Sequence, residues 1–396
     1  MKTMKQAPAT VIMLAATLAV GSFGHRANAQ EIIKIGYSVP LSGAAAIWGK
    51  GAAWMCEKAA GEIKADGGVK IGGKTYNFEC PAYDNKYTAS EATKVAQILL
   101  NKDGVKYIFA LGTAPILATQ SLSERQDALL LSTSWGKNSK GPKFPLTFAV
   151  INSPVEIMPA MIKYIIETYP KAKTLVVLNT TDATGKEMEE TALPMWKESG
   201  ITILSSDHYE RGTTEFQPIA QRLMSFNADM VDLSTVPPSD AGMVFKELDL
   251  LGYKGIKISD NGTEAEGFVK TGGKAANGVY MGAAVTLDGP SATERQRKLN
   301  EEAQAAVGGP LNIISIGSYD AVYMLKAGME KAQSIDPKLV AAVLPKTTFK
   351  SFYGGMIGLG GKASYGSDMA PQLPVYITQI VDGKVAERLR VEMGKK

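Results

Sequence analysis

The sequence predicts an α/β fold made of two lobes, each with a parallel sheet covered by helices on both faces. Short runs of β-branched and apolar residues alternate with segments of helical spacing, and short loops join them. This alternation stops and restarts near Asn152. The chain has 396 residues, which is more than one hydrophobic core usually supports. Together these three observations predict a duplicated α/β lobe.

The first ordered stretch, Ile32–Trp48, predicts both a central strand and one wall of a binding cleft. It begins with the β-branched run Ile32–Ile35, breaks at Pro40, and continues as a helix from about Ala44. A strand that turns into a helix leaves the turn at the carboxyl edge of the sheet, where open α/β folds bind ligands. Trp48 lies just past this turn, so we interpret it as a wall of the cleft. Packing of Trp48 in the core is the alternative.

The rest of the first half continues the same alternation. Glycine pairs and Asp-Gly steps end the predicted helices, and apolar residues at every second position indicate strands. The predicted elements are the helix Ile47–Ala65, the strand Thr75–Tyr83, the helix Thr88–Asn101, the strand Val105–Leu111, a helix that ends at Arg125, and the strand Leu129–Leu131.

The second half repeats the pattern and ends in a β-rich tail. The predicted helices are Ser153–Tyr169, Thr184–Ser199, Glu215–Ser225, Ser239–Leu251, Ser291–Ala306 and Ile316–Ala332. The predicted strands are Lys173–Leu178, Ile201–His208, Asp229–Leu233, Ile256–Ile258 and Gly278–Leu287. Asp382-Gly383 is a strong turn signal, so the flanking segments Val375–Val381 and Lys384–Arg390 are predicted to form a hairpin.

Residues 1–29 have the features of a cleaved signal peptide. Lys2 and Lys5 form a basic start, Val11–Val20 is an apolar run, and Ala27-Asn28-Ala29 gives the small-x-small pattern of a cleavage site. Ten apolar residues are too few to cross a bilayer, which needs about 20. We therefore expect a soluble protein exported to the periplasm, without a transmembrane or lipid anchor.

The charge of the remaining chain argues against polyanionic partners. Removal of the leader takes out Lys2, Lys5 and Arg26 but no acidic residue, so the formal charge falls from +4 to +1. The chain also has no cluster of basic residues. We therefore expect neither nucleic acid nor an anionic membrane as the main partner.

The two cysteines, Cys56 and Cys80, are predicted to form a disulfide. They lie on the first helix and in the second strand, which pack together in a βαβ unit, and the expected compartment is oxidising. Closing a loop of this size stabilises a fold by about 3 kcal/mol. Two buried free thiols are the alternative, and under either interpretation the cysteines are poor nucleophiles.

The chain lacks the residues of common enzymatic sites. Once the leader is removed, His208 is the only histidine, which excludes histidine-based triads and multi-histidine metal sites. The glycine-rich segment 358–361 lacks the βαβ setting of a dinucleotide loop, so we interpret it as a turn. We expect no metal, no cofactor and no catalytic activity.

Six runs of the sequence, spread over nearly the whole chain after the leader, resemble a known family. They are IKIGYSVPLSGAAAIWGKG, GGVKIGGKTYNFECPAYDN, ASEATKVAQILLNKDGVKYIFALGT, LSERQDALLLS, TTEFQPIAQRL and GSYDAVYMLKAGME. In order and spacing they are similar to periplasmic solute-binding proteins for branched-chain amino acids. The resemblance implies a type I periplasmic binding protein, with two Rossmann-like lobes, a three-crossing hinge, and a cleft that closes on its ligand.

The resemblance also implies lobe boundaries and partners. Lobe one would take residues 32–150 plus 285–352, and lobe two residues 152–284 plus 353–396. The protein would act as a monomer that delivers its solute to an ABC transporter permease in the inner membrane.

In lobe one, two turns at strand ends are predicted to bind a ligand carboxylate, because helix amino termini there offer free N–H groups. Thr113 can donate a hydroxyl and Ala114 an amide; the alternative is that Thr113 only caps its helix. Ser134 and Trp135 match the family's second carboxylate-binding turn, with ordinary turn chemistry as the alternative.

In lobe two, three turns are predicted to close over the ligand, although each also fits a structural turn. They contain Asp182 and Thr184, Val236 and Pro237, and Asp260 and Asn261.

Lobe two departs from the pattern of amino-acid binders, which place a carboxylate and one or two tyrosines there. Asp260 is the candidate for that carboxylate, but Thr184 and Val236-Pro237 stand where an aromatic residue is expected. A buried ammonium without a partner costs several kcal/mol. Trp135 suits a flat aromatic body. Hydrophobic amino acids and aromatic carboxylates of the benzoate or cinnamate type are therefore both candidate ligands.

Two other classes of function remain as alternatives to transport. A ligand-sensing receptor domain of the same fold would act on a signalling partner, but the leader without an anchor and the lack of a fused output domain favour transport. An exported dehydrogenase or hydrolase is disfavoured by the single histidine and by the lack of a cofactor loop or nucleophile elbow.

Overall fold

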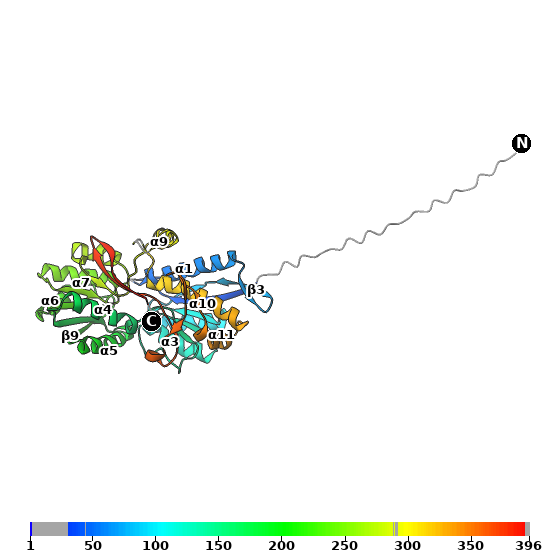
Figure 1. Ribbon diagram of the computed structural model, residues 1–396, viewed down its shortest axis with the longest axis horizontal. Coiled ribbons are helices and arrows are strands. Elements are labelled where there is room, and N and C mark those ends of the chain that lie inside the picture. Colours follow the sequence, from blue (N-terminus) through cyan, green and yellow to red (C-terminus); the bar gives the residue numbers. More distant parts are fainter. Residues whose placement is uncertain (2–30, 44, 288, 290–291, 393–396) are drawn as a thin grey trace.

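The computed structural model describes residues 1, 31–43, 45–287, 289 and 292–392. Its described strands form two seven-stranded sheets and two short two-stranded sheets. Figure 1 shows the two large α/β units side by side, with the blue, cyan and orange elements on one side and the green elements on the other. The predicted signal peptide, residues 1–29, lies almost entirely outside the described residues.

The first sheet contains the beginning of the chain, in the order β2-β3-β1-β5-β6-β7, with β4 also paired to β1. All pairs are parallel except the hairpin β2–β3. Its strands are β1 (Glu31–Val39), β2 (Val69–Ile71), β3 (Lys74–Glu79), β4 (Ala82–Asp84), β5 (Tyr107–Ala110), β6 (Leu129–Ser132) and β7 (Thr147–Ala149).

One predicted strand is split in two. The sequence predicted a single strand over Thr75–Tyr83, but the structure breaks it into β3 and β4 at Cys80-Pro81. Proline has no N–H to donate to a ladder. The Pro81 carbonyl still accepts a hydrogen bond of 2.7 Å from the Tyr37 N–H. β1 therefore pairs first with β3 and then with β4, and its far end reaches the carboxyl edge of the sheet.

Six α-helices belong to the first sheet by sequence position or packing. They are α1 (Ala46–Ala65), α2 (Ala89–Gln97, continued by the π-helical turn η1, Ile98–Lys102), α3 (Thr113–Arg125), α9 (Glu294–Val307), α10 (Ile313–Ala332) and α11 (Pro337–Val343, continued by η3, Leu344–Lys346). The late helices α9 and α10 both contact α1, and α10 shares one hydrophobic core with β1 and α1.

The second sheet has the order β18-β17-β12-β11-β10-β8-β9. Its strands are β8 (Thr174–Thr180), β9 (Thr202–Tyr209), β10 (Met230–Asp232), β11 (Ile256–Ser259), β12 (Tyr280–Met281), β17 (Val375–Val381) and β18 (Lys384–Val391). Its helices are α4 (Pro154–Thr168), α5 (Ala183–Glu198), α6 (Gln217–Ser225), α7 (Pro238–Leu250), α8 (Glu266–Gly272) and η2 (Gly273–Ala276). Apolar clusters cover both of its faces.

The β17–β18 hairpin forms around Asp382 and Gly383, as predicted. Both turn residues have positive φ, 48° and 76°, which suits an Asp-Gly hairpin turn. The predicted strand Gly278–Leu287, by contrast, is too long. Only Tyr280 and Met281 pair within the sheet, because the chain then leaves it toward α9.

The chain passes between the two large units three times, after β7, after β12, and before β17. The remaining elements lie before the last passage: β13 (Phe349–Lys350) pairs β14 (Met356–Ile357), and β15 (Leu359–Gly360) pairs β16 (Ala370–Pro371), with α12 (Lys362–Tyr365) between them. The lobe boundaries predicted at 150, 284 and 352 remain predictions. Leu359, Tyr365 and Ala370 pack with the first sheet's core, so we propose a last boundary near 373 instead of 352.

Two classes of feature are missing from the described part of the chain. None of its helices combines the length and apolar character that a membrane crossing requires. It also contains no group of three or more His, Cys, Asp or Glu side chains arranged to hold a metal ion.

The predicted disulfide is present. Cys56 in α1 is bonded to Cys80, which follows β3, across 24 positions of sequence. Both cysteines are buried in the first core, so the bond fastens α1 to the junction between β3 and β4.

Removal of this disulfide should lower the free energy of unfolding by about 3 kcal/mol, because the bond closes a loop in the unfolded chain. The measurement is urea denaturation of the Cys56→Ser, Cys80→Ser double variant beside the wild type. Wild-type protein in excess reductant is the control and should show a similar loss. A change of less than about 1 kcal/mol in both samples would contradict the prediction.

Candidate functional site

The turns at the carboxyl edge of the first sheet bring several predicted residues together. Thr113 is the first residue of α3, after the turn at Gly112, and is fully buried. Its side chain makes no capping hydrogen bond, and Gly112 is the N-cap. Among the described residues, the Thr113 hydroxyl has no hydrogen-bond partner. Helix capping therefore does not account for the Thr113 side chain. Its neighbour Ala114 is half-buried and lies in the same first turn of α3.

Trp48 lies at the third position of α1 and links the two lobes. Its indole Nε1–H donates a hydrogen bond of 3.1 Å to the Thr263 hydroxyl of lobe two. Its ring centroid is 6.2 Å from that of Tyr87, which follows β4. Tyr87 in turn packs on Gly112, where a Cβ atom would lie 3.0 Å from its ring. Trp48 and Tyr87 thus form an aromatic wall next to Thr113.

Ser134 and Trp135 lie in the loop after β6 and are both buried. Ser134 takes part in turn hydrogen bonds, because its N–H donates to the Ser132 hydroxyl and its own hydroxyl accepts from Gly136 N–H, each at 3.2 Å. Trp135 packs in the first core. The structure thus shows turn chemistry for Ser134, and its proposed ligand contact remains a prediction.

In lobe two, Asp182 is bound to an arginine that the sequence interpretation missed. Asp182 caps α5 by accepting from Gly185 N–H at 3.2 Å. Its other oxygen lies 2.7 Å from Arg211 Nε. Burial raises the pKa of Asp182, but the Arg211 guanidinium and the hydrogen bonds from Thr180 and Gly185 together outweigh burial, so the net shift is downward. Asp182 is thus already paired, and it is a poor partner for a ligand ammonium.

Arg211 also crosses to lobe one. Its guanidinium carbon is 4.8 Å from the centre of the Tyr87 ring. Burial raises the pKa of the Tyr87 phenol, and Arg211 and the nearby Thr184 hydroxyl oppose that shift. Thr184 itself is buried in the first turn of α5. Tyr87, Arg211 and Thr184 therefore meet where the two lobes face each other.

The remaining lobe-two candidates follow β10 and β11 at the same edge of the second sheet. Val236 packs in the core of lobe two, Pro237 precedes α7, and Asn261 is a half-buried turn residue. Asp260 accepts from the Ser234 hydroxyl at 3.2 Å, and its N–H donates to Asp232 at 3.3 Å.

Asp260 and Asp232 form a buried acid pair. Burial raises the pKa of both carboxyl groups, and the repulsion between them raises that of Asp232 further. Both shifts favour the protonated form of the pair. This state weakens the predicted role of Asp260 as the free carboxylate that holds an ammonium.

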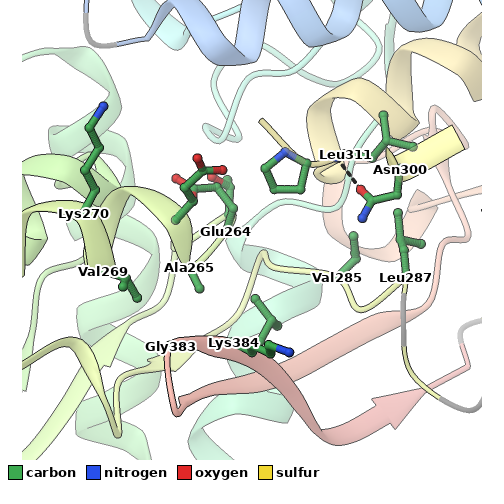
Figure 2. Close-up of a pocket in the computed structure, with 14 residues that line it drawn as sticks. Glu264, Ala265, Val269, Lys270, Val285, Leu287, Asn300, Leu311, Gly383 and Lys384 are labelled. Carbon is green, nitrogen blue, oxygen red and sulfur yellow. Dashed lines mark hydrogen bonds between the residues drawn. The ribbon is translucent and has the colours of Figure 1, made fainter. Parts of the chain in front are cut away.

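A cavity of about 550 Å³ lies beside the second crossing, and Val285 and Leu287 are among its lining residues. Thr263, which accepts the Trp48 hydrogen bond, is one of its lining residues. Figure 2 shows residues of both lobes around the opening, with Val285 and Leu287 of the crossing opposite Glu264.

The residues that the sequence interpretation missed share one position in the fold. Tyr87 follows β4 and Arg211 follows β9, so both lie in turns after parallel strands, like the residues that were predicted. Thr113 was located by the rule that ligands bind at turns after parallel strands. The same rule, applied to every strand end, would have located Tyr87 and Arg211 as well. Thr263 had no comparable signal, because its hydrogen bond with Trp48 depends on how the lobes meet.

The chain belongs to the periplasmic binding protein family, whose model matches residues 32–384. This membership confirms the predicted family and the binding, non-enzymatic class of function, and it implies an extracytoplasmic location. The chain is 26% identical over 339 residues to the Leu/Ile/Val-binding protein BraC3 of Rhizobium johnstonii, over 85% of this chain and 89% of that protein. It is 25% identical over 362 residues to the leucine-, isoleucine-, valine-, threonine- and alanine-binding protein of Pseudomonas aeruginosa, over 89% and 92%.

Solved structures confirm the predicted two-lobe α/β fold. The leucine binding protein LivK of Thermotoga maritima has a TM-score of 0.77 at 18% identity, over 91% of this chain and 99% of that chain. An ABC transporter solute binding protein of R. palustris, in complex with benzoate, has a TM-score of 0.74 at 17% identity, over 91% and 97%.

The contact between Tyr87 and Arg211 should contribute to ligand affinity, because it joins the lobes in the closed arrangement. A double-mutant cycle with Tyr87→Leu and Arg211→Met, followed by calorimetric titration of a bound ligand, measures this contribution. A desolvated cation–π contact predicts a coupling energy of about 1 kcal/mol. Strictly additive losses would show that the two side chains do not act together in closure.

Proposed function

We propose that this protein is the solute-binding component of an ABC uptake system and that it holds a small carboxylate between its lobes. The observation that carries the proposal is the Thr113 hydroxyl, which is buried without a hydrogen-bond partner in the described structure, at the start of α3. A buried hydroxyl of this kind costs free energy unless a ligand satisfies it. Its position at a helix amino terminus favours a negatively charged ligand group.

The backbone of α3 supports the same assignment. The first hydrogen bond of this helix runs from Ile116 N–H to the Gly112 carbonyl. The amides of Thr113 and Ala114 therefore have no acceptor within the helix. Two amides and one hydroxyl provide three donors for a single carboxylate.

The ligand should have an apolar body that packs on aromatic side chains. Trp48 and Tyr87 form a wall next to the proposed carboxylate position. Some similar proteins are described as binding leucine, isoleucine and valine, and one similar structure contains benzoate. Branched-chain or other hydrophobic amino acids and aromatic carboxylates are therefore the two ligand classes that we propose.

Closure of the lobes would present a composite surface to the membrane permease, as in a two-state binding protein. A receptor domain of the same fold would use the same closure to act on a signalling partner. A pulldown from membranes distinguishes the two, because capture of a permease supports transport and capture of a signalling receptor contradicts it.

Replacement of Thr113 by valine should weaken carboxylate binding by about 1–3 kcal/mol, because one hydrogen bond to a charged group is lost while the side-chain shape is kept. Ser134→Ala tests the second turn in the same way. Isothermal titration with the best ligand measures both variants, and Thr93→Val on the exposed side of α2 is the control. Unchanged affinity in both Thr113→Val and Ser134→Ala would refute the carboxylate assignment.

The ligand class can be identified by thermal denaturation of ligand-stripped protein. The panel sets leucine, isoleucine, valine and phenylalanine against benzoate, 4-hydroxybenzoate, cinnamate and coumarate. At 100 times its dissociation constant, a ligand stabilises the folded state by about 2.7 kcal/mol, which gives a clear rise in Tm. A rise with members of either class supports the proposal, and no rise with any carboxylate contradicts it.

A further inference from the structure

Lys140 is a buried lysine of lobe one whose ammonium has no hydrogen-bond partner. It lies in the loop that follows β6, and only 5% of it is exposed. Within the described part of the chain, no group accepts a hydrogen bond from its Nζ. The ammonium lies over the ring of Tyr365, 4.8 Å from the ring centre. A buried charge is costly unless it is paired, so the surroundings of this lysine decide its role.

Lobe two forms part of the wall around Lys140. Gly136, in the same loop, touches Glu187 of α5, because a Cβ atom at position 136 would overlap the Glu187 carboxylate. Glu187 is only 8% exposed. Glu156, in the first turn of α4, is also a lobe-two residue, and its charge acts on Lys140 together with that of Glu187. Separation of the lobes would therefore remove both carboxylates and hydrate the ammonium.

These carboxylates do not compensate Lys140 for its burial. Burial lowers the pKa of Lys140 to about 8, although Glu156 and Glu187 act in the opposite direction. Glu156 already accepts hydrogen bonds from Ser153 N–H at 2.8 Å and from the Tyr365 hydroxyl at 2.7 Å. Glu187 Oε2 has no hydrogen-bond partner among the described groups. The positive charge is therefore buried without a hydrogen-bonded counterion.

The other groups of this cluster do not lose or gain charge in the way that Lys140 does. Lys137, in the same loop, repels the ammonium and lowers the pKa of Lys140 further. Burial raises the pKa of the Tyr365 phenol, so the phenol stays neutral. Burial also raises the pKa of Glu187, and Glu190 of the same helix adds to this shift. Lys140 is thus the group whose buried form gives up a proton on the alkaline side of neutrality.

We propose that the charge of Lys140 opposes closure of the lobes, and that closure releases the Lys140 proton to the solvent. With the lobes apart, water stabilises the ammonium. Closure replaces this water by the Tyr365 ring and by two carboxylates that form no hydrogen bond with the ammonium. The charge therefore keeps the solute-free lobes apart near neutral pH. This inference goes beyond the proposed function, because it does not depend on which solute binds.

The direction of the pH dependence follows from the two states of Lys140. In the closed form its pKa is about 8, which is below the ordinary lysine value that a hydrated ammonium has. Between these two values closure releases one proton, so the ratio of closed to open protein should rise about tenfold per pH unit. Below about pH 8, Lys140 keeps its proton in both forms and adds no pH dependence.

Two other buried groups give a different response. The pKa of Glu187 is raised in the closed form, so its contribution to closure decreases as the pH rises, which is the opposite sign. Burial also lowers the pKa of Lys257, but this ammonium donates to the Ala275 carbonyl at 2.6 Å within lobe two. Its surroundings do not change when the lobes separate. Closure that increases with pH therefore identifies Lys140.

The test is small-angle X-ray scattering of the ligand-stripped protein at pH 7, 8, 9 and 10. The fraction of closed protein is obtained from the scattering curves of the wild type, of Lys140→Met and of Lys143→Met. Methionine keeps an unbranched apolar side chain but has no charge. Lys143 is an exposed lysine of the same loop, so Lys143→Met is the matched control.

The closed fraction of the wild type and of Lys143→Met should rise from pH 8 to pH 10. Lys140→Met should be more closed than the wild type at pH 7 and should show no further rise. If Lys140→Met does not fold, Lys140→Gln replaces it, and the same result is expected.

Two results would overturn the inference. One is a closed fraction of the wild type that stays constant or falls between pH 8 and pH 10. The other is a variant at position 140 that responds to pH as the wild type does. Because the samples contain no solute, a failure of the protein to bind any carboxylate would refute the proposed function and leave this test unaffected.

Discussion

The lobe interface is governed by the cost of burying polar groups. Thr113, Lys140 and Glu187 all lie out of solvent where the lobes meet, and each has a polar atom without a protein partner. A folded chain tolerates few such groups, because each one loses its hydrogen bonds to water. The two sheets place these groups by turning their carboxyl edges toward each other. We propose that a solute bound between the lobes completes the hydrogen bonds of these groups.

Much of the fold could be predicted, because local patterns and tertiary packing agree. β1, the α1 and α10 helices, and the β17–β18 hairpin follow from apolar runs, helical spacing and an Asp-Gly turn. The errors occur where one residue breaks a pattern, as Pro81 does between β3 and β4. They also occur where the chain leaves a sheet, as after Met281. A run of apolar residues continues past that point, but it passes between the lobes instead of pairing.

The candidate site was predictable in part, because strand ends in a parallel sheet are recognisable from sequence alone. Thr113 could be located by this rule, and its free hydroxyl is a finding of the structure. Asp182 could be located as well, but its pairing with Arg211 could not, because the two residues are brought together only by β8 and β9. The position of Glu187 against Gly136 is a property of two lobes in contact, and no pattern within one segment encodes it.

The hinge also restricts how the lobes can move. Asn152, in the first crossing, donates from Nδ2 to the carbonyl oxygens of Leu373 at 3.5 Å and Pro374 at 3.0 Å, which belong to the last crossing. These two crossing segments are thus hydrogen-bonded to each other, while the second crossing runs separately from Met281 toward α9. Two crossings joined by hydrogen bonds resist twisting of one lobe against the other more than they resist bending at the hinge. The lobes should therefore open by rotation about a single axis and not by rotation in several directions.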